Sequence, residues 1–208
     1  IEKGKNWLLT AQNSDGSWGD LSRLNSSTFI DTMTVLDTLD YLSIKDTPYA
    51  NGIQWIEMQE VEGTELLSRK ILNLAKAGKD ISGLITELVL SQNGDGGWGS
   101  DKGHPSDVSN TMLVLRSILV LGYGDEIFRN KIARYIITNQ NTDGGWSFAG
   151  RLNTTAHEEL KVSDIYVTSL VAYVFKEFNI SGYEQQISNA INWLLSKQNP
   201  DGSFGENE

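Results

Sequence analysis

The fold is decided by residues 3–18, which read KGKNWLLTAQNSDGSW. The apolar residues ahead of the turn have helical spacing, and Asp15-Gly16 then supplies the left-handed turn at which a helix can end. A glutamine near a helix C-terminus can bond the carbonyls that the helix leaves unpaired. We therefore expect Gln12 to close this helix and Trp18 to cover the joint that follows.

The same turn returns along the chain, which is typical of a repeat protein. It reads QNGDGGW at residues 92–98, QNTDGGW at 140–146 and QNPDGSF at 198–204, with a degenerate copy at 59–63. The glutamines recur every 33 to 58 residues, the length of two helices and two loops. Most copies have a second aromatic residue five positions before the glutamine. We assign a structural role to Trp7, Gln12, Trp18, Gln92, Trp98, Gln140, Trp146, Trp193, Gln198 and Phe204.

These repeats predict an all-α chain of helical hairpins. We expect nine helices, near residues 2–11, 28–42, 48–60, 64–77, 81–91, 107–121, 125–139, 162–176 and 184–197. Lysine, arginine and asparagine interrupt the apolar positions ahead of each turn, which suits an outer, solvent-facing layer. The helix after each turn is more apolar, above all at residues 112–121, and should form an inner layer that is covered on most sides. Ser27 or Thr28, Ser106 and Ser163 are the expected N-caps of these inner helices.

The composition excludes several classes of function. The chain has 208 residues and a net charge of −10, which opposes binding to nucleic acid or anionic lipid. The absence of cysteine excludes disulfides, thiolate nucleophiles, thioesters and cysteine-ligated zinc. The longest apolar run, Met112–Leu121, is far shorter than a transmembrane segment and contains Arg116. We expect a soluble chain; its composition leaves the compartment open between the cytoplasm, secretion and the cell surface.

Residues 3–18 resemble the QW motif of squalene-hopene and oxidosqualene cyclases, and the third, fourth and fifth copies match it well. The resemblance covers nearly the whole chain. It implies an α/α toroid, the ring of helical hairpins that these enzymes share with class II diterpene cyclases and the β subunits of protein prenyltransferases. We expect one toroid domain over residues 1–208. Because family toroids have more helices than are expected here, this domain should be part of a ring that further sequence completes or that closes by self-association.

In the cyclases that the chain resembles, an Asp-x-Asp-Asp-Thr motif at the start of an inner helix protonates an alkene or epoxide. Three segments align with that motif, residues 28–32, 107–111 and 161–165. Only the second keeps the leading aspartate, Asp107, and Ser109 stands where the family has its catalytic acid. Asp107 is therefore the single catalytic candidate, with a helix N-cap as the alternative that we favour.

Further residues are candidates for ligand binding. Around the aligned segments they are Phe29, Asp31, Asn110, Asp164 and Tyr166. The longest loop, residues 150–161, adds His157, because long loops at one rim of a ring are where binding groups gather. His104 and His157 are either solvated loop histidines, which we favour, or a metal pair. We expect no metal and no cofactor, since the zinc site of prenyltransferases includes a cysteine that this chain lacks.

Three functions remain open. The first is a non-catalytic module that binds a small apolar, isoprenoid-like ligand or a partner. The second is a protonation-initiated terpene cyclase in which Asp107 is the acid and the rings of Phe29 and Tyr166 stabilise carbocations. The third is a structural scaffold. We favour the first, because the complete acid motif, a metal triad and a nucleophile are all missing from the sequence.

Overall fold

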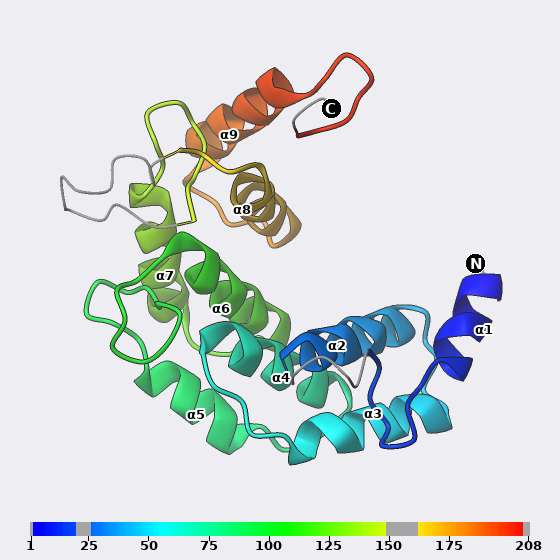
Figure 1. Cartoon of the computed structure of the whole chain (residues 1–208). Helices are drawn as coiled ribbons and strands as arrows, with labels where there is room; N and C mark the ends of the chain where they lie inside the picture. Colours follow the sequence, from blue (N-terminus) through cyan, green and yellow to red (C-terminus); the bar gives the residue numbers. More distant parts are fainter. Residues whose placement is uncertain (1, 20–25, 149–161, 206–208) are drawn as a thin grey trace. The chain divides into compact units, whose positions relative to one another are not determined.

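The computed structural model describes residues 2–19, 26–148 and 162–205 (Figure 1). In this part of the chain all regular secondary structure is helical, and extended backbone forms only the isolated bridges Trp98–Asp107 and Gln198–Phe204. The nine helices of the described residues lie within three residues of their predicted limits. The chain divides into two compact units, Ile1–Leu90 and Ser91–Glu208.

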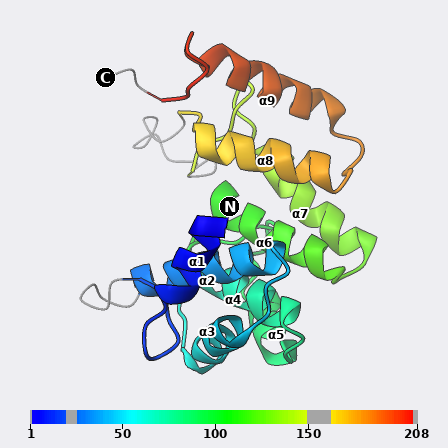
Figure 2. The same cartoon turned by 90° about the vertical axis from the view of Figure 1, so that its right-hand side faces the viewer.

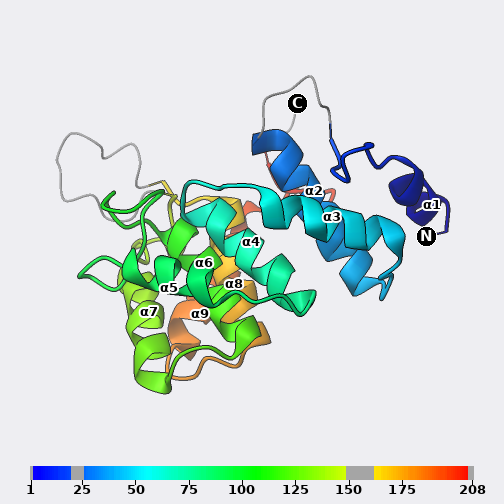
Figure 3. The ribbon, with the colours of Figure 1, turned by 90° about the horizontal axis from the view of Figure 1, so that it is seen from below.

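The first unit contains α1 (Glu2–Thr10), α2 (Ser26–Tyr41), α3 (Thr47–Met58), α4 (Thr64–Lys76) and α5 (Ser82–Leu90). We call α1, α3 and α5 first helices, since each precedes a turn, and α2 and α4 second helices. α2 packs against α3 and α4, and α4 packs against α3 and α5; Figure 3 shows α2 and α3 side by side. The core of this unit contains Trp18, Phe29, Met33, Leu36, Leu39, Tyr49, Ile53, Ile56 and Leu74.

The second unit contains α6 (Val108–Leu121), α7 (Glu126–Thr138), α8 (Ile165–Glu177) and α9 (Glu184–Lys197). In this unit α7 and α9 are the first helices, since each precedes a turn, and α6 and α8 are the second helices. α6 packs against α7 and α8, and α8 packs against α9, beside which it lies in Figure 2. All residues from Thr111 to Leu115 are buried, as are Val108, Ser117 and Ile118. The prediction that this apolar helix is covered on most sides is confirmed.

The N-caps of the second helices differ from those predicted. α6 and α8 begin behind Asp107 and Asp164, whose carboxylates accept the N–H three residues further on at 2.8 and 2.9 Å. The predicted caps Ser106 and Ser163 are one residue too early, because their hydroxyls instead donate to the aspartate of the preceding turn at 2.8 and 2.7 Å. α2 starts at Ser26, ahead of both caps that were expected for it.

Candidate functional site

The glutamine of each full turn bonds the turn itself rather than the end of its helix. Gln12 Nε2 donates to the carbonyl of Gly16 and to that of Pro48, in the first turn of α3, both at 2.8 Å. Gln140 makes the same pair of bonds, to Gly144 and to Gln186 in the first turn of α9, also at 2.8 Å. The prediction that the glutamine bonds the free carbonyls of its own helix is wrong for these bonds. Its amide joins the turn to the next first helix.

The glycine after the aspartate is required by both backbone angle and space. Gly16 has φ of 94°, and a Cβ built there would lie 2.8 Å from the carbonyl oxygen of Asn51. Gly144 has φ of 98° and would meet the carbonyl oxygen of Asn189 at 2.9 Å. Any other residue would be strained at these positions and would push the next first helix away. The predicted left-handed turn is therefore confirmed.

A threonine clamp, which sequence reasoning missed, holds the turn against the second helix. The Oγ1 atoms of Thr32, Thr111 and Thr168 each accept the backbone N–H of the turn tryptophan at 2.9 Å. All three threonines are buried, and so are Trp18, Trp98 and Trp146. The available signal was the threonine that ends two of the three aligned segments, residues 28–32 and 107–111.

The clamp corrects the register of the third aligned segment. Thr168 is the counterpart of Thr111, so residues 164–168, and not 161–165, correspond to residues 107–111. The backbone agrees, because the N–H of Asp164 donates to Trp146 at 2.8 Å as the N–H of Asp107 donates to Trp98 at 2.9 Å. The alignment of residues 161–165 rested on sequence similarity around Ser163, which carries no information about these long-range bonds. In the corrected register both second-unit segments begin with an aspartate cap.

Asp107 has both carboxylate oxygens engaged by one neighbour. Oδ1 accepts the backbone N–H of Asn110 and Oδ2 accepts its side-chain amide, each at 2.8 Å. Burial raises the pKa of Asp107 above its usual value, although the hydrogen bonds from Asn110 oppose the shift. The structure thus brings Asp107 and Asn110 together, as a capping pair. The geometry is that of a helix cap.

The other predicted binding residues are spread over both units. Phe29 is buried in the core of the first unit, with its ring centroid 5.7 Å from that of Trp55, whereas Asp31 is exposed on α2. Tyr166 on α8 is 52% exposed and stacks on Phe148, with ring centroids 6.2 Å apart and planes inclined by 16°.

Of the two histidines, only His104 is among the residues that the structure describes. His157 and the whole loop 150–161 lie outside the described residues. His104 is exposed, with Nδ1 2.8 Å from the hydroxyl of Ser100. Among the residues that the structure describes, no three His, Asp or Glu side chains are grouped so that they could hold a metal ion.

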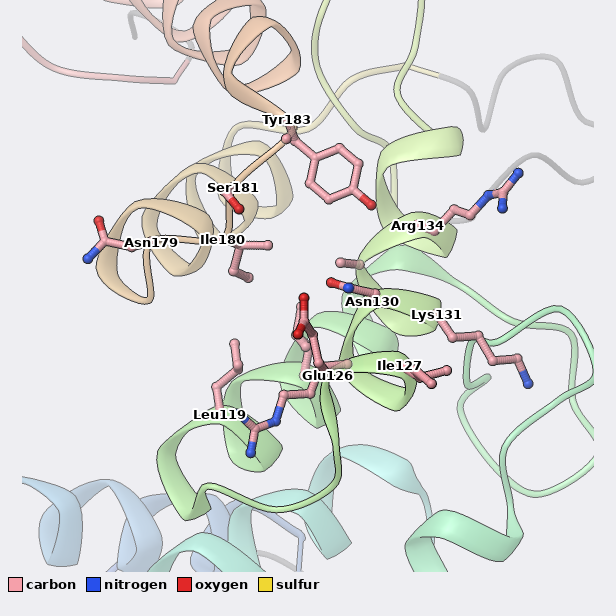
Figure 4. A pocket seen from close by; sticks show the side chains of 14 residues that line it. Leu119, Glu126, Ile127, Asn130, Lys131, Arg134, Asn179, Ile180, Ser181 and Tyr183 are labelled. Carbon is pink, nitrogen blue, oxygen red and sulfur yellow. The ribbon is translucent and has the colours of Figure 1, made fainter.

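Each unit also contains a cleft. In the first unit a cleft of about 860 Å³ lies between the end of α3, the start of α4 and α5, and Phe29 is among its lining residues. In the second unit a cleft of about 820 Å³ separates α7 from the loop between α8 and α9 (Figure 4). In that view Tyr183 reaches towards α7, while Lys131 and Arg134 project away from the loop. Neither cleft is lined by Asp107, Asn110, Asp164 or Tyr166.

Residues 19–208 match the family model of the prenyltransferase α/α toroid domain. The chain belongs to this family. The toroid fold that the QW-like turns implied is therefore confirmed, although the first turn, which ends at Trp18, lies ahead of the matched residues. No curated protein sequence matches the chain. The described residues contain no helix with the length and apolar character needed to cross a bilayer.

Solved structures of terpene cyclases share this toroid fold. The ent-copalyl diphosphate synthase from Streptomyces platensis is 17% identical, with a TM-score of 0.63 over 86% of this chain and 36% of its own. A type II terpene cyclase from Scytonema, bound to geranylgeranyl dihydroxybenzoate as substrate, is 15% identical, with a TM-score of 0.67 over 99% of this chain and 65% of its own. The same cyclase bound to its product merosterolic acid A is 16% identical, with a TM-score of 0.66 over 99% of this chain and 66% of its own. The toroid described here thus spans about a third of the synthase and about two thirds of the cyclase.

Proposed function

We propose that this toroid is a non-catalytic module that binds a small apolar, isoprenoid-like ligand. The observation that carries the proposal is a row of exposed aromatic rings at α8. Phe148, Tyr166 and Tyr173 are 51%, 52% and 53% exposed, and the last two are seven positions apart, which places them on one face of the helix. Exposed aromatic surface of this kind is costly in water and suits a flat or chain-like apolar ligand.

The surroundings of Asp107 argue against catalysis by this chain. A carboxyl group that protonates an alkene must present its proton to the substrate, whereas both oxygens of Asp107 accept hydrogen bonds from Asn110. Ser109, which stands in the place of the family's acid, has no proton of comparable acidity. Both points support a binding role for a toroid that has kept the family's fold without its acid.

The choice of an isoprenoid-like ligand rests on the family. The Scytonema cyclase that the chain resembles was solved with a geranylgeranyl-bearing substrate. A branched hydrocarbon chain of this class has the apolar surface that the rings on α8 would cover. The net charge of −10 disfavours ligands that carry a free diphosphate.

The test is a titration of the purified chain with geranylgeraniol and with squalene, followed by native mass spectrometry and product analysis. Each ring is about half exposed, so covering it contributes about 1 kcal/mol, and Tyr166→Ala and Tyr173→Ala should each weaken binding about fivefold. The control is Tyr41→Ala. Tyr41 lies on α2, outside the proposed site, and its side chain is 87% exposed, more than either tyrosine of α8. Equal affinity in all three variants would show that α8 does not contact the ligand. If the wild type binds neither geranylgeraniol nor squalene, the scaffold function is favoured.

The second candidate function is a protonation-initiated cyclase, and the raised pKa of Asp107 favours it. Burial that raises this pKa keeps the carboxyl protonated to higher pH, which a proton donor requires. If a cyclised hydrocarbon forms and Asp107→Asn abolishes it without lowering ligand affinity, the non-catalytic proposal fails.

A further inference from the structure

The second repeat lacks the turn that the other repeats share. Between α3 and α4 the chain runs only from Gln59 to Gly63, with no Asp-Gly pair and no tryptophan. Gln59 Nε2 bonds the carbonyl of Trp55, four residues earlier, at 3.2 Å. In the first and fourth repeats that same carbonyl position accepts the indole N–H of the turn tryptophan, at 2.7 and 2.8 Å. The glutamine of the second repeat thus occupies a site that a tryptophan takes elsewhere.

In the first, third and fourth repeats a ring from the next first helix lies against the turn. Trp55 hydrogen-bonds Asp15 of the first turn. In the third repeat the ring of Tyr135 lies 2.9 Å from where a Cβ on Gly97 would be. Trp193 lines a shallow hollow together with residues 141–144 of the fourth turn.

In the second repeat the equivalent position, five residues before Gln92, holds Glu87. The cleft of about 860 Å³ opens between this residue and the shortened loop 59–63. It therefore lies where the other repeats place a polypeptide turn against the next first helix. The floor is apolar, with Phe29, Trp55 and Leu84 among its lining residues.

Carboxylates surround this cleft. Asp15, Glu57, Glu60, Glu62 and Glu87 line it, and all five are exposed. Hydrogen bonds from Ser17 and Trp55 outweigh the effect of burial and hold the pKa of Asp15 below its usual value, so this carboxylate stays charged in neutral and mildly acidic solution.

Among the residues that the structure describes, Lys70 is the only cation that lines the cleft, and it is 6% exposed. Its Nζ donates to the backbone carbonyls of Glu57 and Gln59, at the end of α3. Burial lowers the pKa of Lys70, and nearby glutamates only partly oppose this shift. The lysine is thus engaged in closing α3. Glu57 is ion-paired with Lys79 at 2.7 Å, so the other four carboxylates give the cleft the negative charge that it presents to an incoming ligand.

We propose that this cleft docks a basic polypeptide segment of a partner protein, with an aromatic side chain seated on the floor between Phe29, Trp55 and Leu84. The polypeptide nature follows from the turns that fill the same place in the other repeats. The aromatic anchor follows from the missing turn tryptophan, and the basic flanks follow from the carboxylates. The site is separate from the exposed rings of α8, so it stands whether or not the proposed isoprenoid function is correct.

The test is a nuclear magnetic resonance titration of the full chain with a blocked peptide, Lys-Lys-Trp-Gly-Lys-Lys, observed at the indole N–H of Trp55. We expect a saturable shift of this signal that weakens as salt is raised. The peptides Glu-Glu-Trp-Gly-Glu-Glu and Lys-Lys-Ala-Gly-Lys-Lys should not produce it. Tryptamine, which carries the ring and one ammonium group without a peptide, should bind more weakly than the peptide.

Two variants test the place and the charge. Val61→Trp puts an indole into the cleft from the short loop and should abolish the shift. Glu60→Gln combined with Glu62→Gln should weaken binding about two- to tenfold, because exposed charge pairs contribute modestly. The control, Glu126→Gln with Glu177→Gln, removes the same charge from exposed positions of the second unit and should change affinity less than twofold.

The proposal is overturned if Trp55 does not respond, if the acidic peptide binds equally, or if the control variant weakens binding as much as the cleft variant. Tryptamine binding as tightly as the peptide would also overturn it, in favour of a small amine ligand. The charge variants alter exposed side chains only, so they decide the question even if Val61→Trp fails to fold.

Discussion

Replacement of Thr111 by valine is the sharpest test of the threonine clamp. The hydroxyl of Thr111 accepts the N–H of Trp98 at 2.9 Å and donates to the carbonyl of Asp107 at 2.6 Å. Thr111 and Trp98 are both fully buried, at 0% exposure. Valine has nearly the same shape, so Thr111→Val removes these bonds without creating a cavity.

The expected loss follows from the burial of the groups that remain. In the variant the Trp98 N–H loses this acceptor in a place that water does not reach, which costs about 1–3 kcal/mol. For a chain of this size each kcal/mol lowers the melting temperature by about 2–4 °C. The variant should therefore melt about 2–12 °C below the wild type when the whole chain unfolds in one step.

The assays are thermal unfolding, which gives the melting temperature, and urea unfolding, which gives the free energy of unfolding; both are monitored by tryptophan fluorescence and near-ultraviolet circular dichroism. The matched control is Thr138→Val, because the hydroxyl of Thr138 bonds the carbonyl of Arg134 at 2.9 Å on an exposed face of the same unit. The control should lose less than about 0.5 kcal/mol, and Thr111→Ser should retain most of the wild-type stability. A Thr111→Val protein within 0.5 kcal/mol of wild type, or a control that loses as much, would refute the clamp.

Two further predictions concern charged groups. Asp107→Ala should cost about 1 kcal/mol through the lost cap. Because burial raises the pKa of Asp107, its ionisation destabilises the fold. The advantage of wild type over the variant should therefore shrink as the pH rises from below 3.8 towards neutrality, which urea unfolding at several pH values would detect. Lys70→Met removes a buried ammonium whose pKa is lowered by burial. The wild type should therefore gain stability relative to the variant as the pH rises towards 10.5, where the unfolded lysine also loses its proton. A difference in unfolding free energy that does not change with pH would contradict this.

The sequence predicted the fold well because its signals are local. The apolar spacing ahead of each turn and the Asp-Gly pair act within a few residues, so helix limits followed to within three positions. The caps of α6 and α8 were missed by one residue, since Ser106 and Ser163 have the right chemistry for a cap. What moves the cap to the following aspartate is the bond of each serine to the preceding turn.

The candidate site was less predictable, because its contacts join residues that are far apart in the chain. The clamp joins Thr168 to Trp146 across a loop of variable length, so the third aligned segment was placed in the wrong register. Similarly, a carboxylate beside the family's acid position gives no indication of whether its oxygens are free. The bonds of Asp107 to Asn110 had to be seen in the structure.

The sequence by itself determined that this is an all-α toroid chain with helical hairpins closed by Gln, Asp-Gly and Trp, because turn chemistry and helical period are properties of neighbouring residues. It also determined that the complete acid motif and every cysteine ligand are missing. Only the tertiary structure decided that Asp107 is held by Asn110, that rings at α8 are exposed, and that a cleft lined by carboxylates opens beside the short loop 59–63. These features depend on which side chains meet across helices, and packing between distant segments sets that arrangement.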